Sequence, residues 1–265
     1  NPGYPPYNSG SVFAGAKVHL MPLRAENGFL PDLEAIGKEV AGKCKLMHIN
    51  YPNNPTGAVC DKKFYEKVVS FAKEHDIIIC SDAAYTEICY DDFMPPSFLE
   101  APGAKEVGIE FHSLSKTFNM TGWRVGMAVG NAKVLEGLAK VKANIDSGIF
   151  TAIQIAAIEA LNHAEEVKAR LKDLYTARRD AFVDGLNSAG WKVSKPLATF
   201  YVWAPVFGDY DSVGLAKAML EKTDIVATPG SGFGKHGEGH IRMAFTMDKE
   251  ELEEATARIK KTFFS

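Results

Sequence analysis

The 265-residue sequence has no excess of positive charge. It contains 30 Lys and Arg against 33 Asp and Glu, which gives a formal net charge of −3. A protein that binds a phosphate backbone needs clustered Lys and Arg to neutralise it. The composition therefore argues against nucleic acid as a partner.

Long hydrophobic runs and paired cysteines are also missing. No apolar segment approaches the roughly 20 residues that a membrane-spanning helix needs, so we expect no membrane partner. The four cysteines, Cys44, Cys60, Cys80 and Cys89, form no Cys-x-x-Cys pair. They are typical of reduced thiols in a cytoplasmic protein.

What the sequence does contain is enough apolar surface for a core, at 46% hydrophobic residues, which excludes a disordered chain. The chain opens on the turn-rich segment 1–7, without Met and without a signal or transit sequence. We expect it to begin inside a domain, with an N-terminal portion missing. A processed native terminus is the alternative.

Apolar runs and amphipathic stretches alternate over residues 1–175. The pattern predicts strands over 16–21, 46–50, 77–80, 107–112 and 124–129. It predicts helices over 31–40, 62–74, 132–142, 151–161 and 165–187. The continuous apolar run at 77–80 is typical of a buried parallel strand. This alternation predicts an α/β domain, built on an open sheet with helices on its faces.

The pattern changes after about residue 175. The remaining sequence predicts strands over 191–193, 199–204, 225–228 and 240–245. It predicts helices over 213–222 and 250–264. We therefore expect two domains: a large one over residues 1–175 and a smaller α+β domain over residues 176–265, joined through the long helix.

Chemically distinctive side chains follow the predicted strands of the large domain. They are Asn54, Asp82, Tyr85, Ser113, Ser115, Lys116 and Arg124. Each one alone has an ordinary structural interpretation, such as a turn residue, a helix cap or a solvated lysine. Ligands of open parallel sheets bind at the carboxyl ends of the strands. Because all of these residues fall at that edge, together they predict a binding site.

The motifs around these residues resemble a known family. They are Pro-Asn-Asn-Pro-Thr-Gly at 52–57, Ser-Asp-Ala-Ala-Tyr at 81–85, and Ser-Leu-Ser-Lys at 113–116 with Gly-Trp-Arg-Val-Gly at 122–126; Arg242 completes the set. In order and spacing they resemble fold type I aminotransferases of class I/II, which use pyridoxal phosphate (PLP). The resemblance implies a three-layer, mostly parallel sheet in the PLP-binding large domain, N-terminally truncated here, and a smaller C-terminal α+β domain.

The resemblance implies roles around the reactive part of the cofactor. Lys116 resembles the lysine that holds PLP as a Schiff base and then moves a proton from the substrate Cα. Such a lysine needs a lowered pKa, which burial and nearby cations could provide. Asp82 would pair with the protonated ring nitrogen and keep the ring an electron sink. Tyr85 and Asn54 would hydrogen-bond its phenolic oxygen, and we expect Asn54 to contact substrate as well.

The resemblance also implies how the rest of the cofactor and the substrate are held. Ser113, Ser115 and Arg124 would bind the phosphate, for which the planar guanidinium is well suited. Tyr4, within Pro-Gly-Tyr-Pro, matches the aromatic that stacks on the cofactor ring. Arg242 resembles the small-domain arginine that binds the substrate α-carboxylate. It can reach the cofactor only if the two domains face each other across a cleft.

The resemblance implies transfer of an amino group between an amino acid and a 2-oxo acid, in a homodimer. Segments 142–150, 228–234 and 237–242 look most like those of LL-diaminopimelate aminotransferases, which link 2-oxoglutarate and glutamate to lysine biosynthesis. Three alternatives stay open: an aspartate- or alanine-type aminotransferase, a lyase of the same fold such as a C–S lyase, and an inactive truncated remnant.

Competing motifs lack the context that they need. Residues 232–237 fit Gly-x-Gly-x-x-Gly, but a predicted strand follows where a dinucleotide site needs a helix. We expect a flexible loop there. His236 and His240 have no acid or cysteine cluster beside them, so no metal site is expected. Ser115 does not stand in a Gly-x-Ser-x-Gly elbow.

Overall fold

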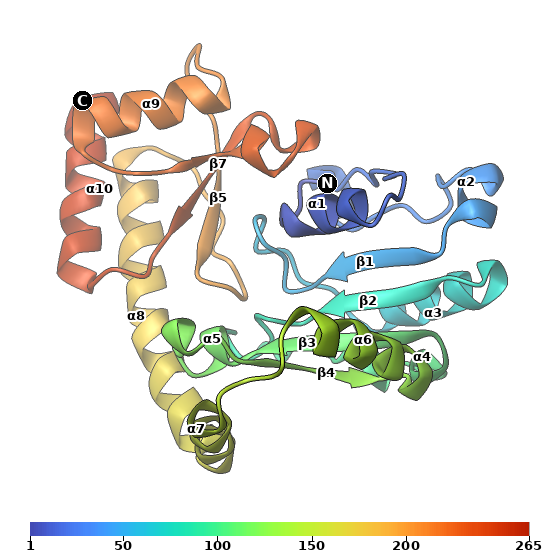
Figure 1. The fold of residues 1–265 in the computed structure, drawn as a ribbon. Helices are drawn as coiled ribbons and strands as arrows, with labels where there is room; N and C mark the ends of the chain where they lie inside the picture. The colour runs from blue at the N-terminus through green and yellow to red at the C-terminus, as the bar shows by residue number, and fades with distance from the viewer. Residues whose placement is uncertain (265) are drawn as a thin grey trace. The chain divides into compact units, whose positions relative to one another are not determined.

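The computed structural model describes residues 1–264 (Figure 1). The chain divides into two compact units. The parallel-sheet unit comprises Leu33–Pro52 and Val59–Leu171. The antiparallel-sheet unit comprises Asn1–Asp32, Asn53–Ala58 and the chain from Lys172 onward.

The parallel-sheet unit is built on four described strands in the order β1-β2-β3-β4. They are β1 (Leu46–Asn50), β2 (Ile78–Asp82), β3 (Gly108–Ser113) and β4 (Gly126–Gly130). Strands β1, β2 and β3 are parallel, whereas β4 runs antiparallel to β3. Their short connections are 3-10 helices η2 (Phe98–Glu100) and η3 (Thr121–Trp123) and the four-residue helices α4 (Ala104–Val107) and α5 (Leu114–Thr117).

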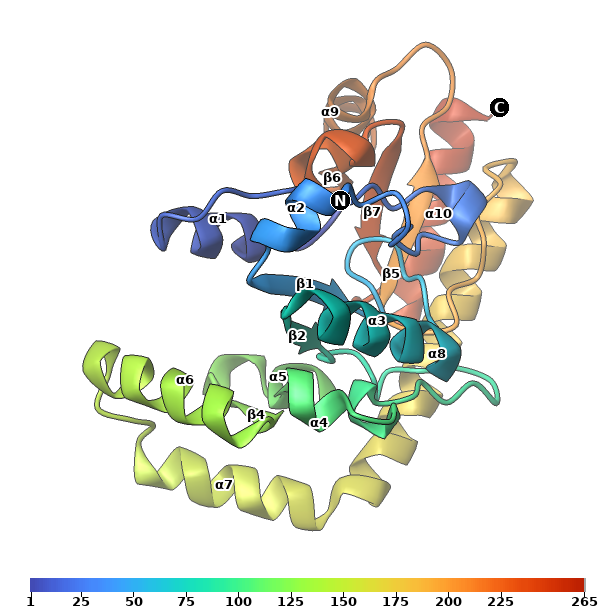
Figure 2. The same cartoon turned by 90° about the vertical axis from the view of Figure 1, so that its right-hand side faces the viewer.

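Helices lie on opposite faces of this sheet, α3 (Lys62–His75) on one and α6 (Ala132–Ile145) on the other (Figures 1 and 2). Helix α3 starts at Asp61, whose carboxylate accepts a hydrogen bond from the Phe64 amide at 2.8 Å. Its apolar stripe, which includes the fully buried Val68, packs into the core. By contrast, none of the residues of α6 is buried.

The other helices of this unit are α2 (Lys38–Lys43), α7 (Thr151–Asn162) and the first part of α8 (Ala164–Ala189). Large apolar side chains are exposed on and between α6 and α7; they are Leu138, Val141, Ile145, Phe150, Ile155, Ile158 and Leu161.

The antiparallel-sheet unit contains three described strands in the order β5-β7-β6. They are β5 (Tyr201–Pro205), β6 (Thr228–Pro229) and β7 (His240–Ala244), and both pairings are antiparallel. The unit also holds α1 (Pro6–Phe13), the rest of α8, α9 (Ser212–Thr223) and α10 (Lys249–Phe263). Short 3-10 helices complete it: η1 (Ala25–Asn27), η4 (Gly230–Phe233) and η5 (Lys235–Gly237).

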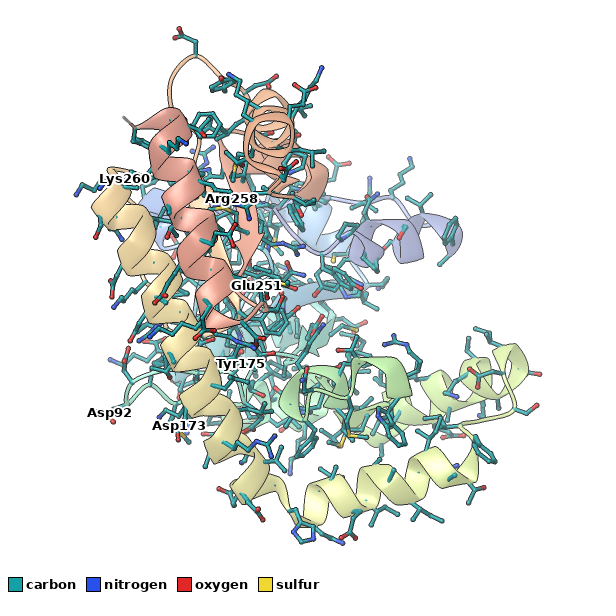
Figure 3. All side chains as sticks on the ribbon, turned by 90° about the vertical axis from the view of Figure 1, so that its left-hand side faces the viewer. Asp92, Asp173, Tyr175, Glu251, Arg258 and Lys260 are labelled. Atoms are coloured by element: carbon teal, nitrogen blue, oxygen red, sulfur yellow. The ribbon has the colours of Figure 1, made fainter. Side chains whose placement is uncertain are left out.

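Helices α8 and α10 run side by side (Figure 3). Their close approach depends on Gly185, where an added Cβ would lie 2.6 Å from Thr256 Oγ1. Arg178 of α8 also pairs with Asp248, the residue that caps α10. The helix pair and β5-β7 share a core in which Val202, Ala204, Ile241 and Met243 are buried.

The predicted fold class is confirmed: an α/β, mostly parallel sheet with a smaller C-terminal α+β part. The division into units differs from the predicted boundary after residue 175, because two N-terminal segments, Asn1–Asp32 and Asn53–Ala58, group with the C-terminal part. The break along the helix comes after Leu171.

Two predicted strands are wrong. Residues 16–21 have no regular structure, and α1 forms just before them, with Pro6 at its first position, where proline is favoured. Residues 191–193 form no strand either. The side chain of Asn187 accepts a hydrogen bond from the Val193 amide and donates one to its carbonyl, so these backbone groups are satisfied without a neighbouring strand.

Other boundaries shift. The helix predicted over 31–40 is observed only from Lys38, as α2, which continues to Lys43. The strand predicted over 225–228 is observed only as the two residues of β6, Thr228 and Pro229. The segment 232–237, predicted as a flexible loop, contains the end of η4 and all of η5. Gly230 and Gly237 face each other so closely that a Cβ on Gly230 would lie 1.9 Å from the Gly237 carbonyl oxygen. Backbone packing therefore accounts for Gly230 and for Gly237, the last glycine of the Gly-x-Gly-x-x-Gly match.

Candidate active site

The carboxyl ends of β1, β2 and β3 meet at one edge of the parallel sheet. Asn50 pairs with Asp82, and Asp82 with Phe111. The antiparallel direction of β4 matters here, because its first residue, Gly126, pairs with Ser113 at the end of β3. The turn before β4, which carries Arg124, therefore belongs to the same edge.

Asp82 is the last residue of β2 and is held by its surroundings. Its Oδ1 accepts a hydrogen bond from the Ala84 amide at 3.1 Å. Its carbonyl oxygen accepts one from Asn50 Nδ2 at 2.8 Å, and the Ala83 amide donates to the Phe111 carbonyl at 2.9 Å. These bonds fix the turn that leads into Tyr85, whose side chain is buried.

Lys116 lies in α5, directly after β3. Its Nζ is 5.8 Å from the centre of the Tyr85 ring. The preceding Leu114 is buried in a cluster with Phe118, Met120 and Ala157, which anchors this short helix. The lysine is therefore carried on a packed turn and faces an aromatic ring from the neighbouring strand end.

Hydroxyl groups and a guanidinium stand on the same edge. Ser115 is buried and Ser113 is half-buried. Arg124 adopts a left-handed conformation with φ 54°, and its Nη1 donates to the Thr121 carbonyl at 2.7 Å. Thr121 Oγ1 in turn donates to the Ser115 carbonyl at 3.2 Å. The turns that carry Ser115 and Arg124 are thus tied together.

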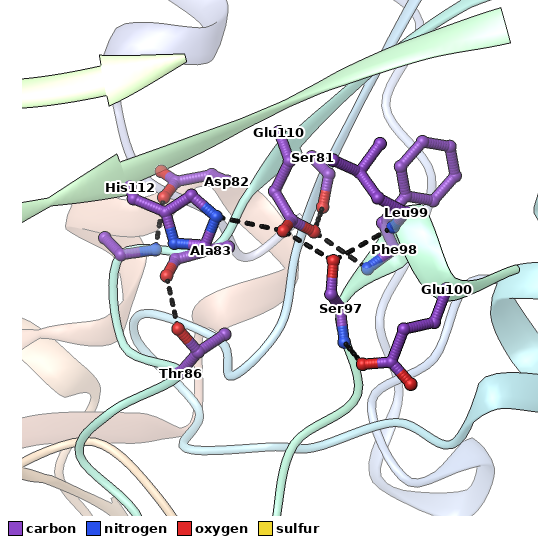
Figure 4. A network of polar contacts seen from close by, with 11 residues as sticks. Ser81, Asp82, Ala83, Thr86, Ser97, Phe98, Leu99, Glu100, Glu110 and His112 are labelled. Carbon is purple, nitrogen blue, oxygen red and sulfur yellow. Dashed lines mark hydrogen bonds and ion pairs between the residues drawn. The ribbon is translucent and has the colours of Figure 1, made fainter. Parts of the chain in front are cut away.

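A carboxylate network that the sequence reasoning missed supports this edge (Figure 4). Glu110, in the middle of β3, is 1% exposed. Its carboxylate accepts hydrogen bonds from Ser97 Oγ and the Phe98 amide, both at 2.8 Å, and contacts His112 Nε2 at 3.0 Å. The signal that could have found it is an acid and a histidine two residues apart within a buried strand.

The network changes the acidity of both partners. Burial alone would raise the pKa of Glu110, but the bonds from His112, Ser97 and Phe98 outweigh it and leave the pKa below its usual value. The hydrogen bond to Glu110 raises the pKa of His112, against the opposing effect of burial. Asp82 and Glu87 contribute in the same raising direction. Both directions favour the charged pair, a carboxylate at Glu110 and an imidazolium at His112.

The second group of predicted residues lies in the antiparallel-sheet unit, where a tight turn carries Asn54. Asn53 Oδ1 accepts hydrogen bonds from the amide and the hydroxyl of Thr56, at 3.1 and 2.7 Å. Gly57 has φ +71°, and an added Cβ would lie 3.3 Å from Cβ of Pro196. Glycine is therefore required at this position by both conformation and space.

Arg242 of β7 contacts this turn. Its Nη1 donates to Asn54 Oδ1 at 2.8 Å, and its Nη2 lies 3.5 Å from Thr228 Oγ1. Its Cζ lies 4.2 Å from the ring centre of Tyr201 and 4.7 Å from that of Phe233. Sequence reasoning predicted Arg242 and Asn54 but not their mutual contact, nor the two rings.

Tyr4 also belongs to the antiparallel-sheet unit, in the turn before α1. It is 45% exposed and meets the edge of Tyr7, with ring centres 5.8 Å apart. Its predicted stacking on a cofactor stays a prediction.

The predicted site residues are thus distributed over the two units. The parallel-sheet unit holds Asp82, Tyr85, Ser113, Ser115, Lys116 and Arg124, and the antiparallel-sheet unit holds Tyr4, Asn54 and Arg242. Within residues 1–264, no group of three or more His, Cys, Asp or Glu side chains could hold a metal ion. No described helix is long and apolar enough to cross a membrane.

Comparison with known proteins adds to this geometry. The family described as "Aminotransferase class I and II" matches residues 1–259. The chain is 56% identical to an LL-diaminopimelate aminotransferase of Moorella thermoacetica over 261 residues, which is 98% of this chain and 67% of that protein. It is 53% identical to an LL-diaminopimelate aminotransferase of Desulforudis audaxviator, over 98% of this chain and 66% of that protein.

Solved structures agree with this comparison. The apo-BacF structure from Bacillus subtilis superimposes with a TM-score of 0.95 at 45% identity, covering 98% of this chain and 70% of that chain. The present chain therefore spans about two thirds of the length of the relatives it matches.

Proposed function

This chain belongs to the class I and II aminotransferase family, and on that premise we propose that it transfers an amino group between LL-diaminopimelate and 2-oxoglutarate with PLP as cofactor. The predicted resemblance to this family is confirmed. The observation that carries the proposal is the grouping of an amine, a phenol and a carboxylate at one sheet edge: Lys116 Nζ is 5.8 Å from the Tyr85 ring, and Asp82 ends the neighbouring strand.

The donor set of the parallel-sheet unit fits PLP chemically. A pyridinium nitrogen needs an anion, which Asp82 offers. A phosphate dianion needs a cation and hydrogen-bond donors, which Arg124, Ser113 and Ser115 offer. An aldehyde carbon needs a primary amine, and Lys116 stands among these groups. We therefore assign the cofactor to these residues, with Tyr4 as the proposed stacking residue.

The chain's own groups then divide the chemistry. When bound, PLP supplies an electron sink for the charge that develops at the substrate Cα as its proton leaves. The Lys116 amine would take that proton from the substrate Cα and pass it to the cofactor. In the second half of the reaction it would carry a proton back to Cα of the 2-oxo acid. The Asp82 carboxylate would hold a proton on the ring nitrogen, and the Tyr85 hydroxyl would donate a hydrogen bond to the phenolic oxygen.

Substrate binding is proposed for Asn54 and Arg242. The Arg242 guanidinium can hold a carboxylate through two parallel hydrogen bonds. Its contact with Asn54 at 2.8 Å orients the group while leaving other N–H groups for the ligand. Both substrates of the proposed reaction carry an α-carboxylate, so one arginine serves the amino acid and the 2-oxo acid in turn.

An amine-transfer assay tests the proposal. The chain with added PLP, LL-diaminopimelate and 2-oxoglutarate should form glutamate, and Lys116→Ala should not. Faster transfer from aspartate or alanine would favour the aspartate- or alanine-type alternative. Release of ammonia or a thiol without a 2-oxo acid would favour the lyase, and no turnover with any donor would leave the inactive remnant. Relatives that are 56% and 53% identical over the aligned residues and carry the LL-diaminopimelate name support the first outcome.

A homodimer and a cytoplasmic location are further parts of the proposal. Exposed apolar side chains on α6 and α7, such as Val141 and Ile158, are the kind of surface that favours association. Sedimentation of the purified chain tests the dimer: a monomer at all concentrations would contradict it.

A further inference from the structure

The guanidinium of Arg242 lies against two aromatic rings. Its Cζ is 4.2 Å from the centre of the Tyr201 ring and 4.7 Å from the centre of the Phe233 ring. Both separations are within the range at which an arginine is attracted to the face of an aromatic ring. The two rings come from different elements, Tyr201 from β5 and Phe233 from η4.

The sheet register accounts for the position of Tyr201. Trp203 pairs directly with Arg242, and Tyr201 pairs with Ala244 two residues further along β7. Directly paired residues share a face of the sheet and so do residues two apart, so Tyr201, Trp203 and Arg242 stand on one face. The other face carries buried residues such as Ile241 and Met243.

A chain of ring contacts fixes Phe233. It meets Trp203 edge-on, with ring centres 6.0 Å apart, and Trp203 is stacked on His240 at 5.1 Å. The edge of Phe29 contacts His240 in turn. Phe233 is 6% exposed and lies in η4, which begins at the close approach of Gly230 to Gly237. Tyr201 is 7% exposed and meets the Phe200 ring, with centres 4.9 Å apart. Neither ring next to Arg242 can therefore move without repacking its neighbours.

The contacts of Arg242 limit how a ligand can reach it. A guanidinium has five N–H donors, all in its plane. Asn54 Oδ1 takes one from Nη1 at 2.8 Å, and Thr228 Oγ1 lies 3.5 Å from Nη2. The Tyr201 and Phe233 rings lie 4.2 and 4.7 Å from Cζ, so the space that they fill is closed to a ligand, which has to meet the remaining N–H groups at the edge of the guanidinium. A planar carboxylate with two oxygens fits that approach.

We propose that Tyr201 and Phe233 are positioning residues that determine how tightly Arg242 binds a substrate carboxylate. The proposal rests on the carboxylate-binding role of Arg242 given under the proposed function. The rings hold the guanidinium plane in the orientation that the carboxylate needs, so the ligand does not have to order a flexible side chain when it binds. Neither residue is assigned a contact with the reacting atoms.

Calorimetric titration of the PLP-supplemented chain with 2-oxoglutarate tests this role. Phe233→Leu and Tyr201→Leu should each raise the Kd for 2-oxoglutarate by about tenfold, because each loses a ring–cation contact and the order that it imposes. Phe233→Tyr and Tyr201→Phe keep the ring and should stay within about threefold of the parent chain. The Kd for PLP should be the same in all four variants.

Phe207→Leu is the matched control. Phe207 belongs to a separate aromatic cluster in the same unit, with Trp191 and Phe264. This variant should lose thermal stability without a change in the Kd for 2-oxoglutarate. If it weakens 2-oxoglutarate binding as much as Phe233→Leu does, general loss of packing explains the effect and the proposal is overturned.

A spectroscopic measurement on the parent chain covers the case in which a leucine variant does not fold. The Nε–Hε signal of Arg242, identified by its loss in Arg242→Lys, should be shifted by ring currents away from the signals of the other arginines. A signal at the position of a solvated arginine would overturn the proposal.

Failure of this inference differs from failure of the proposed function. If the parent chain binds 2-oxoglutarate and all ring variants bind it equally well, the positioning role is wrong and the aminotransferase proposal stands. If binding follows the predicted series but no amino group is transferred, the positioning role stands and the proposed function fails. A parent chain that does not bind 2-oxoglutarate overturns the inference directly.

Discussion

Two carboxylates of the parallel-sheet unit show how position decides the role of a residue. Glu110 is buried inside β3, and its donors, which include Ser97, Phe98 and His112, hold its negative charge. Asp82 stands at the carboxyl end of β2, half-buried, with Oδ1 fixed by the Ala84 amide. We interpret the first as a structural charge and the second as one oriented toward a ligand.

Asp82→Asn tests the second role. Asparagine keeps the shape and the acceptor for the Ala84 amide but cannot stabilise a proton on the cofactor ring nitrogen. We expect kcat for amine transfer to fall by several orders of magnitude, an increase in barrier of about 4–7 kcal/mol. Asp76→Asn, at an exposed helix end, serves as control and should be neutral. Near-normal turnover in Asp82→Asn would show that Asp82 is only a turn residue.

The Glu110–His112 pair predicts a pH-dependent stability. The pKa of His112 is raised above 6.5 in the fold. Its contribution to the free energy of unfolding is therefore complete below pH 6.5 and is lost as the pH rises through the raised pKa. The pKa of Glu110 is lowered below 4.5, so its contribution is present above 4.5 and is lost as the pH falls through the lowered pKa. The pair therefore stabilises the folded state most between pH 4.5 and pH 6.5.

His112→Gln keeps a donor for Glu110 but removes the positive charge. We expect it to lower the free energy of unfolding at pH 6 by about 1–2 kcal/mol, the difference between a hydrogen bond of charged groups and a neutral one, and by less at pH 9. Denaturant titrations at both pH values measure this. His163→Gln, in an exposed pair with Glu159, should show little loss at either pH. Equal losses at both pH values for His112→Gln would contradict the assignment of an imidazolium.

At the scale of elements, the sequence could predict the helices and strands whose bounds depend on their own residues. Strand 46–50 is observed with the predicted bounds, and α3 starts at the predicted cap, Asp61. Strand 191–193 could not be excluded from its pattern. The turn after α8 brings Val193 back to the Asn187 side chain of that helix, whose hydrogen bonds replace those of a neighbouring strand. The antiparallel direction of β4 depends on its pairing with β3, which the sequence pattern of β4 alone does not reveal.

The turn that carries Asn54 offers a prediction at this scale. Gly57→Ala should lower the free energy of unfolding by about 1–3 kcal/mol, because φ is +71° and the new Cβ would press on Pro196. It should also weaken 2-oxoglutarate binding, since Asn54 orients Arg242. Thermal melts and calorimetric titration measure the two effects.

Gly15→Ala is the matched control for this prediction. Gly15 has φ +75° but nothing within 4 Å of an added Cβ, so it reports the conformational cost alone. We expect it to be less destabilising than Gly57→Ala and without effect on 2-oxoglutarate binding. Equal losses of stability in the two variants would show that contact with Pro196 does not matter.

At the scale of the whole molecule, the motifs predicted chemistry better than organisation. The order and spacing of the motifs were sufficient for the family, which the comparisons confirm. They did not reveal that Asn53–Ala58, although it follows β1 in the chain, belongs to the antiparallel-sheet unit. That assignment comes from packing of Gly57 against Pro196 and of Asn54 against Arg242, contacts between residues more than a hundred positions apart.

The central claim is that Lys116 is the residue that binds PLP, and one measurement tests it most directly. The chain is incubated with PLP, reduced with borohydride, digested and examined by mass spectrometry. We predict a single modified lysine, Lys116, and no modified peptide from Lys116→Ala treated in the same way. Modification of another lysine in the parent chain, or an undiminished PLP adduct in Lys116→Ala, would contradict the account.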